Sequence, residues 1–293
     1  MPRPRRTWGR LARCSRQRAD SKGKGQIGWQ QIKMLMASAR IIIPCYNEEK
    51  RLDVASFSDF RSASHSIGFL FVDDGSADGT LRLLQSLNAA DPARFKVLHL
   101  PRNHGKAEAV RQGFLLAIDS HPDYVGFWDA DLATPLDAIG EFIDVAESRP
   151  DLEMIIGSRV KLLGRSIERR PMRHYLGRFF ATTVSIVLGL EVYDTQCGAK
   201  LFRVSPSIKA LFEQPFLSRW IFDVEILARL IKARRGKELR QPEQAIYEFP
   251  LTVWQDIPGS KLRYSDFARA VWELYRIRNH YFRGFEPEPL HTV

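Results

Sequence analysis

The chain has 293 residues, of which 44% are hydrophobic, enough to bury one large core or two small ones. The formal net charge is +10, but residues 1–40 hold eleven Lys or Arg residues and one acidic residue, so the rest of the chain is neutral overall. This distribution excludes a body that binds nucleic acid through a basic surface, and no apolar stretch suits a secretory signal.

Residues 1–38 form a basic tail rich in Arg, Ser and Gly with few large apolar side chains, and we predict that the tail is disordered. A second interpretation is an electrostatic anchor on an anionic membrane, where each basic residue contributes about 1 kcal/mol. The tail also resembles organelle transit peptides, and Met34 or Met36 is an alternative start of the chain.

Beyond the tail, short apolar runs alternate with segments of helical periodicity. Residues 106–118 place apolar side chains at helical spacing, and residues 135–148 begin with a proline suited to a first helical turn. The alternation predicts an α/β fold with a doubly wound, mostly parallel sheet and a ligand cleft at the carboxyl ends of its strands. The runs that predict parallel strands are Ile41 to Ile43, Phe69 to Val72, Phe95 to Leu100, Tyr124 to Trp128 and Met154 to Ile156.

Acidic pairs end two of these apolar runs. Asp129 and Asp131 follow one strand two residues apart, so both carboxylates can face the same side and reach one hard cation such as Mg²⁺ or Mn²⁺. Asp73 and Asp74 end another run, with turn formation or helix capping as the simpler alternative. Two such sites predict a metal-assisted enzyme acting on a phosphorylated ligand.

Two other nucleotide-binding motifs fail on context. Gly23, Gly25 and Gly28 match G-x-G-x-x-G but lie in the basic tail and follow no strand, so we reject a dinucleotide-binding site. Gly105-Lys106 lacks the upstream glycine and the following Ser or Thr of a P-loop.

In order along the chain, the motifs resemble those of the family 2 inverting glycosyltransferases, which have the glycosyltransferase-A fold. Residues 41–49 resemble the opening strand and loop of that family, residues 71–80 the second, residues 103–107 the third nucleotide-side loop, and residues 129–131 the metal-binding D-x-D motif. The resemblance implies that the nucleotide-sugar donor is bound by Pro44, Tyr46, Asn47, Glu48, Asp73, Asp74, Gly75, Lys106 and Asp129.

The carboxyl half resembles the dolichyl-phosphate β-glucosyltransferase branch of the family, through residues 157–159, 194–202 and 219–225 and through Trp254. Related polyprenyl-phosphate mannose synthases typically carry Gln where this chain has Ala133, which favours glucose over mannose. The resemblance therefore implies inverting transfer of glucose from UDP-glucose to a polyprenyl or dolichyl phosphate.

The chemistry of that reaction assigns roles to further residues. A cation held by Asp129 and Asp131 would stabilise the charge on the departing diphosphate. A lipid monophosphate is already anionic near neutral pH, so basic side chains need only position it. We predict catalytic roles for Asp131, Arg159 and Asp223. We predict acceptor phosphate or sugar contacts for Arg170, Arg173, Gln196, Lys200, Arg203, Arg219 and Trp220.

Simpler roles stay open for some of these residues. Arg159 suits an ordinary ion pair, and Asp223 and Glu225 suit pairing with Arg219 as well as contact with sugar hydroxyls. Three functions also remain as alternatives: transfer from GDP-mannose, transfer to a soluble acceptor, and a catalytically silent protein that binds nucleotide sugars or acts as a scaffold.

Two segments suit a membrane interface. Residues 170–190 begin with basic side chains and continue with an apolar stretch too short for the roughly 20 residues that span a bilayer, so we predict an interfacial amphipathic helix, with a buried core helix as the alternative. Residues 264–293 begin with an amphipathic segment of aromatic and Arg side chains. We thus expect a catalytic domain over residues 39–263 and peripheral attachment to the cytosolic membrane face. The sequence assigns no oligomeric state.

Overall fold

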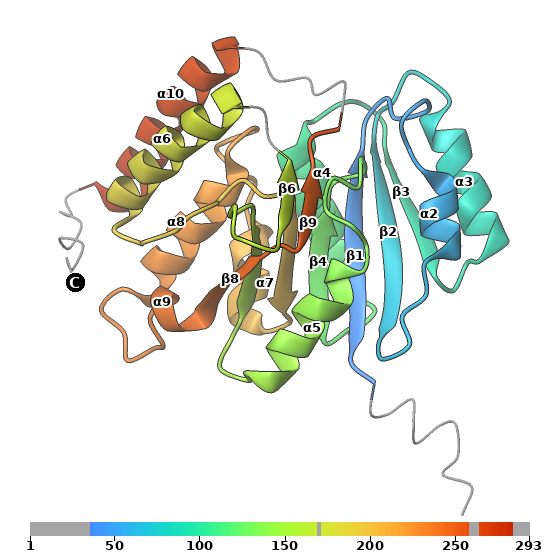
Figure 1. Cartoon of the computed structure of the whole chain (residues 1–293), viewed down its shortest axis with the longest axis horizontal. Helices are drawn as coiled ribbons and strands as arrows, with labels where there is room; N and C mark the ends of the chain where they lie inside the picture. Colours follow the sequence, from blue (N-terminus) through green and yellow to red (C-terminus); the bar gives the residue numbers. More distant parts are fainter. Residues whose placement is uncertain (1–35, 169–170, 258–263, 284–293) are drawn as a thin grey trace, which may run out of the picture. The chain divides into compact units, whose positions relative to one another are not determined.

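The structure is a computed structural model that describes residues 36–168, 171–257 and 264–283. Nearly all of the predicted tail therefore lies outside the described residues, as do Arg170 and most of the segment after α10. The side chain of Arg173 is also outside the description. Figure 1 shows the order of the elements along the chain.

A seven-stranded sheet forms the centre of the fold, in the order β3-β2-β1-β4-β7-β5-β8. Six strands run in the same direction, and β7 runs antiparallel to both of its neighbours, β4 and β5. The predicted mostly parallel α/β sheet is confirmed, including all five predicted strands. The strands of this sheet are β1 (Ser38–Cys45), β2 (Ser66–Asp74), β3 (Phe95–Leu100), β4 (Tyr124–Trp128), β5 (Met154–Ser158), β7 (Ala199–Arg203) and β8 (Ile246–Pro250).

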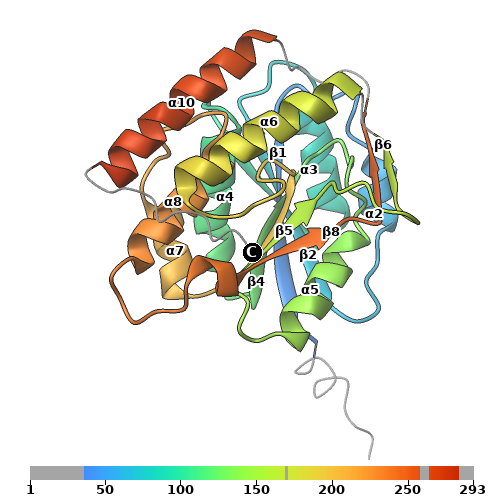
Figure 2. The ribbon, with the colours of Figure 1, turned by 60° about the vertical axis from the view of Figure 1, so that its left-hand side comes forward.

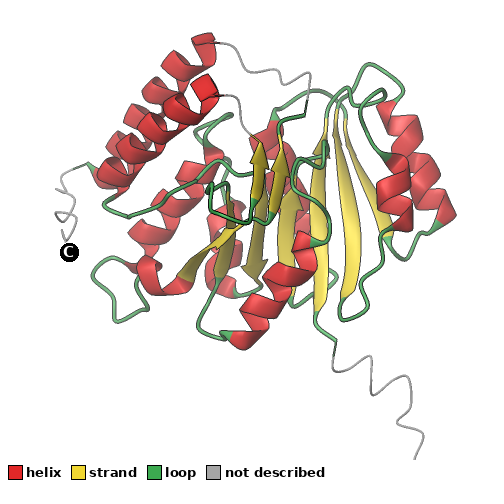
Figure 3. Cartoon of the chain, viewed as in Figure 1, coloured by secondary structure: helices red, strands yellow, loops and turns green. Residues whose placement is uncertain are grey.

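A second, two-stranded sheet pairs β6 (Ser166–Glu168) with β9 (Val253–Gln255) in parallel. Helices lie on both faces of the large sheet, and α6 and α10 pack against α8 (Figure 3). The described helices are α2 (Val54–Asp59), α3 (Thr80–Ala90), α4 (Lys106–Ile118), α5 (Ala138–Ser148), α6 (Pro171–Leu188), α7 (Pro206–Glu213), α8 (Phe222–Arg234), α9 (Pro242–Ala245) and α10 (Tyr264–Phe282).

Side chains of the central strands point alternately to the two faces of the sheet and pack into two hydrophobic cores, one on each face. Ile41 and Ile43 of β1 pack into the core with α2, α3 and α5, whereas Ile42 packs into the core with α4, α7 and α8. Because both faces are buried, β2, β4 and β5 are continuous apolar runs that carry polar side chains only at their ends. This pattern concentrates the functional residues at the strand termini.

The two helices predicted between the strands are present, one with a shifted start. Helix α4 has the predicted bounds. Helix α5 begins at Ala138, three residues later than predicted, because Pro135 opens a turn in which its carbonyl accepts the Ala138 N–H at 3.3 Å.

Helix α6 has two different faces. Phe180, Val184 and Leu188 are buried in the core shared with α8 and α10, whereas the side chains of Phe179 and Ile186 are 66% and 57% exposed. The core-helix alternative is therefore right for the inner face. Figure 2 shows α6 and α10 side by side. Among the described residues, no helix is both long enough and apolar enough to cross a membrane.

Candidate active site

Strand β4 delivers Asp129 and Asp131 to the carboxyl edge of the sheet. The Asp129 N–H donates to Gly198 O at 3.0 Å, and the backbone of Gly198 lies so close that a Cβ there would be 1.9 Å from Oδ2 of Asp129. The Asp131 carboxylate accepts the Ala133 N–H at 3.1 Å. Both side chains stay partly exposed, at 38% and 28%, so a ligand can reach them.

Two cationic side chains face this acidic pair. Lys106 Nζ lies 2.5 Å from Asp129 Oδ1, and Arg51 Nη2 lies 3.7 Å from Asp131 Oδ2. Burial, together with the neighbouring charge of Asp129, raises the pKa of Asp131. Burial opposes the charged form of Lys106, but the carboxylates of Asp129 and Asp223 outweigh it and raise the pKa of Lys106. The electrostatic potential around Lys106 is therefore set mainly by the neighbouring carboxylates.

The acidic pair fits a hard divalent cation. Within the described part of the chain, no group of three or more His, Cys, Asp or Glu side chains is arranged to hold a metal ion. Two carboxylates suit Mg²⁺ or Mn²⁺, which take their remaining ligands from waters and substrate phosphates. Burial and the charge of Asp129 both raise the pKa of Asp131, and a nearby cation would favour its ionised form against both.

Asp73 and Asp74, at the end of β2, hold neighbouring loops in place. The Asp74 carboxylate accepts the N–H groups of His104 and Gly105, each at 2.7 Å. Asp73 Oδ2 lies 2.7 Å from His99 Nδ1, and Asp73 also accepts a turn N–H. The turn-forming alternative is thus realised for Asp73, whereas Asp74 holds the loop before α4. Their predicted contact with the nucleotide stays a prediction.

Hydrogen bonds join the loop after β1 to the turn after β2, where Gly75 has a φ of 65°. Asn47 Oδ1 accepts the Ala77 N–H at 2.9 Å, and the Glu48 N–H donates to Thr80 Oγ1 at 2.8 Å. The preceding Tyr46 is 38% exposed, and Pro44 is part of β1. The predicted donor-binding loops therefore lie side by side at the carboxyl edge.

Arg159, at the end of β5, forms a bidentate ion pair with Asp194. Nε and Nη2 of Arg159 lie 2.6 and 2.7 Å from the two carboxylate oxygens. The guanidinium lies over the Trp254 ring, with Cζ 5.3 Å from the ring centroid. Burial opposes the charge on Arg159, but Asp194 outweighs it and raises the pKa of Arg159. The ion-pair alternative is confirmed. A catalytic role for Arg159 stays a prediction.

Lys200 and Asp223 form a second pair, deeper in the protein. Lys200 is fully buried, with Nζ 2.5 Å from Asp223 Oδ1 and 2.7 Å from Cys197 O. This burial corrects the prediction that Lys200 contacts the acceptor, because its ammonium group has no exposed surface and is already paired. Lys200 instead holds Asp223, whose side chain is 8% exposed.

The prediction for Arg203 is wrong. Arg203 pairs in register with Tyr124, the first residue of β4, so it lies at the opposite end of that strand from Asp129. Its guanidinium donates to Leu152 O at 3.1 Å and to Ala146 O. The error arose because β7 runs antiparallel, which places its carboxyl end at the far edge of the sheet.

Arg219 and Trp220 lie on the segment between α7 and α8. Arg219 Nη2 donates to Asn103 Oδ1 at 3.2 Å, and its guanidinium lies beside Gly105 of the same loop. Trp220 is 39% exposed. Glu225 is fully buried and pairs with Arg229 of its own helix, which corrects the alternatives that paired it with Arg219 or with a sugar.

Sequence reasoning missed two residues that shape the site. Arg51 lies between the carboxylates of Glu48 and Asp131, and its place three residues after Glu48 was the available signal. Glu248 of β8 accepts the N–H groups of Tyr193 and Asp194, each at 2.8 Å, and so fixes the loop that carries the half-buried Gln196. No local pattern marks Glu248, because its partners are more than fifty residues away.

Comparisons with known proteins agree with this geometry. A family model described as glycosyl transferase family 2 matches residues 40–211. The chain is 32% identical over 265 residues to the dolichyl-phosphate beta-glucosyltransferase of Saccharomyces cerevisiae, covering 83% of this chain and 75% of that protein. The human dolichyl-phosphate beta-glucosyltransferase is 29% identical over 263 residues, covering 83% and 76%.

A solved structure supports the fold assignment. The glucosyl-3-phosphoglycerate synthase of Mycobacterium tuberculosis, crystallised with Mn²⁺, UDP-glucose and phosphoglyceric acid, has a TM-score of 0.60 at 17% identity and covers 87% of this chain and 86% of that one. The sheet, the acidic edge and the family match agree, and the chain belongs to glycosyl transferase family 2 and is a glycosyltransferase.

Proposed function

We propose that this glycosyltransferase moves glucose from UDP-glucose to a dolichyl or polyprenyl phosphate with inversion at the sugar carbon. The observation that carries the proposal is the partly exposed pair Asp129 and Asp131, facing Lys106 at the carboxyl edge of the sheet. The dolichyl-phosphate beta-glucosyltransferases, to which the chain is about 30% identical, supply the glucose and the lipid phosphate of the proposal.

On the donor side, Asp129 and Asp131 would hold Mg²⁺ or Mn²⁺. When bound, such a cation acts as a Lewis acid that stabilises negative charge on the departing diphosphate. Lys106 and Arg51 add positive charge beside the same carboxylates. The loop that carries Asn47 and Glu48 would contact the nucleotide.

On the acceptor side, the chain needs to position a phosphate rather than to deprotonate it. A phosphate monoester carries a negatively charged oxygen near neutral pH, and attack by that oxygen on the face of the sugar opposite the leaving group inverts the anomeric carbon. Arg219 lies against the donor-side loop through its hydrogen bond to Asn103, and it would contact the acceptor phosphate. Asp223 pairs with Lys200 and would shape the site from behind.

The outer surface of α6 and α10 supports a peripheral membrane site. We call this surface the α6–α10 face. It carries exposed apolar and aromatic side chains, and exposed arginines flank them on α10. Such composition suits the boundary between headgroups and acyl chains. The exposed apolar and aromatic residues of the α6–α10 face are Phe179, Ile186, Val271, Trp272 and Tyr275.

The hydroxyl groups on α6 are compatible with a membrane site at the α6–α10 face. Thr182 Oγ1 donates to Arg178 O at 3.0 Å, and Thr183 Oγ1 donates to Phe179 O at 2.9 Å, so both satisfy their hydrogen bonds within the helix. The α6–α10 face would hold the enzyme on the cytosolic side of a membrane, with residues 39–263 as the catalytic domain and residues 264–293 as an amphipathic appendage.

The test is a donor and acceptor screen with purified protein and Mn²⁺ or Mg²⁺. We expect release of UDP and formation of a lipid-linked glucose from UDP-glucose and dolichyl phosphate, with little reaction from GDP-mannose. A clear preference for GDP-mannose would overturn the donor assignment. Nucleotide binding without turnover for every acceptor, soluble ones included, would establish a catalytically silent protein instead.

A further inference from the structure

The segment of residues 214–221, between α7 and α8, brings Arg219 and Trp220 to the active-site edge. A cavity of about 890 Å³ lies against this segment, lined in part by the segment's own residues and by Arg229 and Tyr281. A surface that borders a cavity lacks packed neighbours on that side. Phe216 and Ile221 anchor the segment in the core on its other side, and polar contacts must hold the residues between them.

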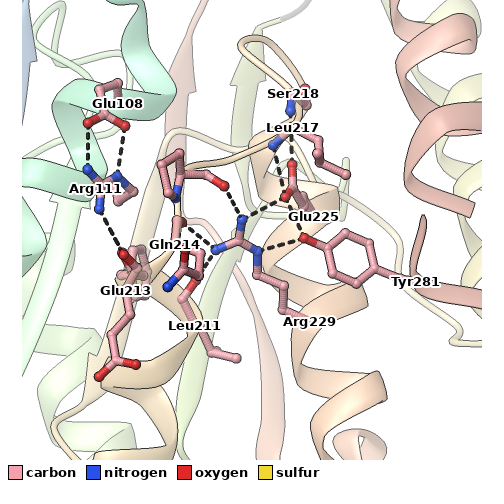
Figure 4. A network of polar contacts seen from close by, with 12 residues as sticks. Glu108, Arg111, Leu211, Glu213, Gln214, Leu217, Ser218, Glu225, Arg229 and Tyr281 are labelled. Atoms are coloured by element: carbon pink, nitrogen blue, oxygen red, sulfur yellow. Dashed lines mark hydrogen bonds and ion pairs between the residues drawn. The ribbon is translucent and has the colours of Figure 1, made fainter.

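The buried carboxylate of Glu225 supplies the first contacts, as Figure 4 shows. Its oxygens accept the N–H groups of Leu217 and Ser218 at 3.0 and 2.9 Å. They also accept from Arg229 Nη2 and from the Tyr281 hydroxyl, both at 2.8 Å. A carboxylate group without exposed surface is tolerated only when hydrogen-bond donors surround it, and these four donors meet that need.

Arg229 fixes the beginning of the segment. Its guanidinium donates to Leu211 O at 2.7 Å, to Gln214 O at 2.8 Å and to Pro215 O at 2.6 Å, where the end of α7 leaves carbonyl groups without partners inside the helix. Arg111 of α4 likewise donates to carbonyls in the last turn of α7. The segment thus starts from a point that two arginines hold.

Helix α10 fixes the rest of the segment. The buried Glu273 Oε2 accepts the Ser218 hydroxyl at 2.5 Å, and Ser218 Oγ accepts the Ile221 N–H at 2.7 Å. Burial, together with the bond to Glu225, raises the pKa of Tyr281 to about 12, so its hydroxyl keeps its proton near neutral pH and can donate. Contacts from α10 therefore reach the middle of the segment both directly and through Glu225.

We propose that Glu225 and Arg229 of α8, with Glu273 and Tyr281 of α10, are positioning residues that hold segment 214–221 for the acceptor. We call these four residues the α8–α10 clamp. The inference rests on the proposed transfer to a lipid phosphate and extends it: the helix whose outer face would meet the membrane also sets, through its inner face, the place of Arg219.

Tyr281→Phe tests the clamp by removing one hydroxyl group. The same change at Tyr247 of β8, outside the clamp, is the matched control. We expect Tyr281→Phe to lower kcat/KM for dolichyl phosphate about tenfold or more, because small misplacements of positioning groups are costly. The KM for UDP-glucose should stay near the wild-type value, whereas the backbone N–H groups of Leu217 and Ser218 should exchange with deuterium faster. Tyr247→Phe should change none of these quantities.

Glu273 provides a second test. Glu273→Gln keeps an oxygen that can accept the Ser218 hydroxyl and should retain more acceptor kcat/KM than Glu273→Ala, when both are assayed well below their melting temperatures. Equal loss in the two variants, or unchanged acceptor kcat/KM in Tyr281→Phe, would overturn the positioning role. A wild-type protein without transfer to lipid phosphates refutes the proposed function, whereas unchanged amide exchange in Tyr281→Phe separately refutes the clamp.

Discussion

Gly198 is the position where one added methyl group should lower turnover without destabilising the fold. A Cβ on Gly198 would lie 1.9 Å from Oδ2 and 2.2 Å from Cγ of Asp129. Because nonbonded carbon and oxygen atoms need about 3.3 Å or more, Gly198→Ala requires the Asp129 carboxylate to move by roughly 1.5 Å. The clashing atoms are the end of a side chain, so the fold can accommodate the change by moving that carboxylate.

The displaced carboxylate can no longer share a cation with Asp131 in the same geometry. A misplacement on the order of 1 Å costs about a hundredfold in rate, so we expect Gly198→Ala to lower turnover by about that factor. Release of UDP measured over a range of Mn²⁺ concentrations should also show a higher Mn²⁺ requirement. The melting temperature should change little.

Gly140→Ala is the matched control for this experiment. Gly140 lies inside α5, and a Cβ there would meet no atom within 4 Å. Replacing a glycine inside a helix by alanine stabilises it by about 0.5–1 kcal/mol, so this variant should keep full turnover and melt at the same or a slightly higher temperature. Wild-type turnover and Mn²⁺ dependence in Gly198→Ala would refute the assigned role of Asp129.

Three further predictions concern the acidic pair and the membrane face. Asp131→Asn should lower turnover by about a hundredfold or more, by analogy with the loss of one preorganised electrostatic contact; unchanged turnover at limiting metal would contradict the metal role. The folded-state pKa of Asp131 is raised, so the stability that its protonated form contributes is present below the ordinary pKa and is lost as pH rises through the raised value. In calorimetry without metal, Asp131→Asn should therefore unfold at a higher temperature than the wild type near neutral pH. The affinity of the wild type for Mn²⁺ should fall on acidification at a higher pH than that at which ordinary aspartates protonate. Changing Phe179 and Ile186 together to Ser should weaken binding to anionic liposomes without lowering the melting temperature, whereas Leu116→Ser, an exposed change on α4, should leave binding intact; equal liposome binding by both proteins would exclude the α6–α10 face.

The sequence by itself determined the features that are encoded over a few residues. The apolar runs that lead to Asp74 and to Asp129 and Asp131 predicted strands β2 and β4, and the acidic residues predicted a functional site at the ends of these strands. The reason is that a strand buried on both faces has room for polar side chains only where it ends. The helical spacing of residues 106–118 gave the bounds of α4, and hence the place of Lys106 at its first turn. The ordered motifs also indicated the family.

The tertiary structure alone decided strand direction, burial and ion-pair partners. Periodicity predicts that a segment is a strand but not which way it runs, so only the antiparallel pairing of β7 shows that Arg203 lies far from Asp129. A charged residue near a motif suits a ligand contact until its burial is known, as Lys200 and Glu225 demonstrate. Their partners are chosen by packing between distant elements, and that choice is a property of the whole fold.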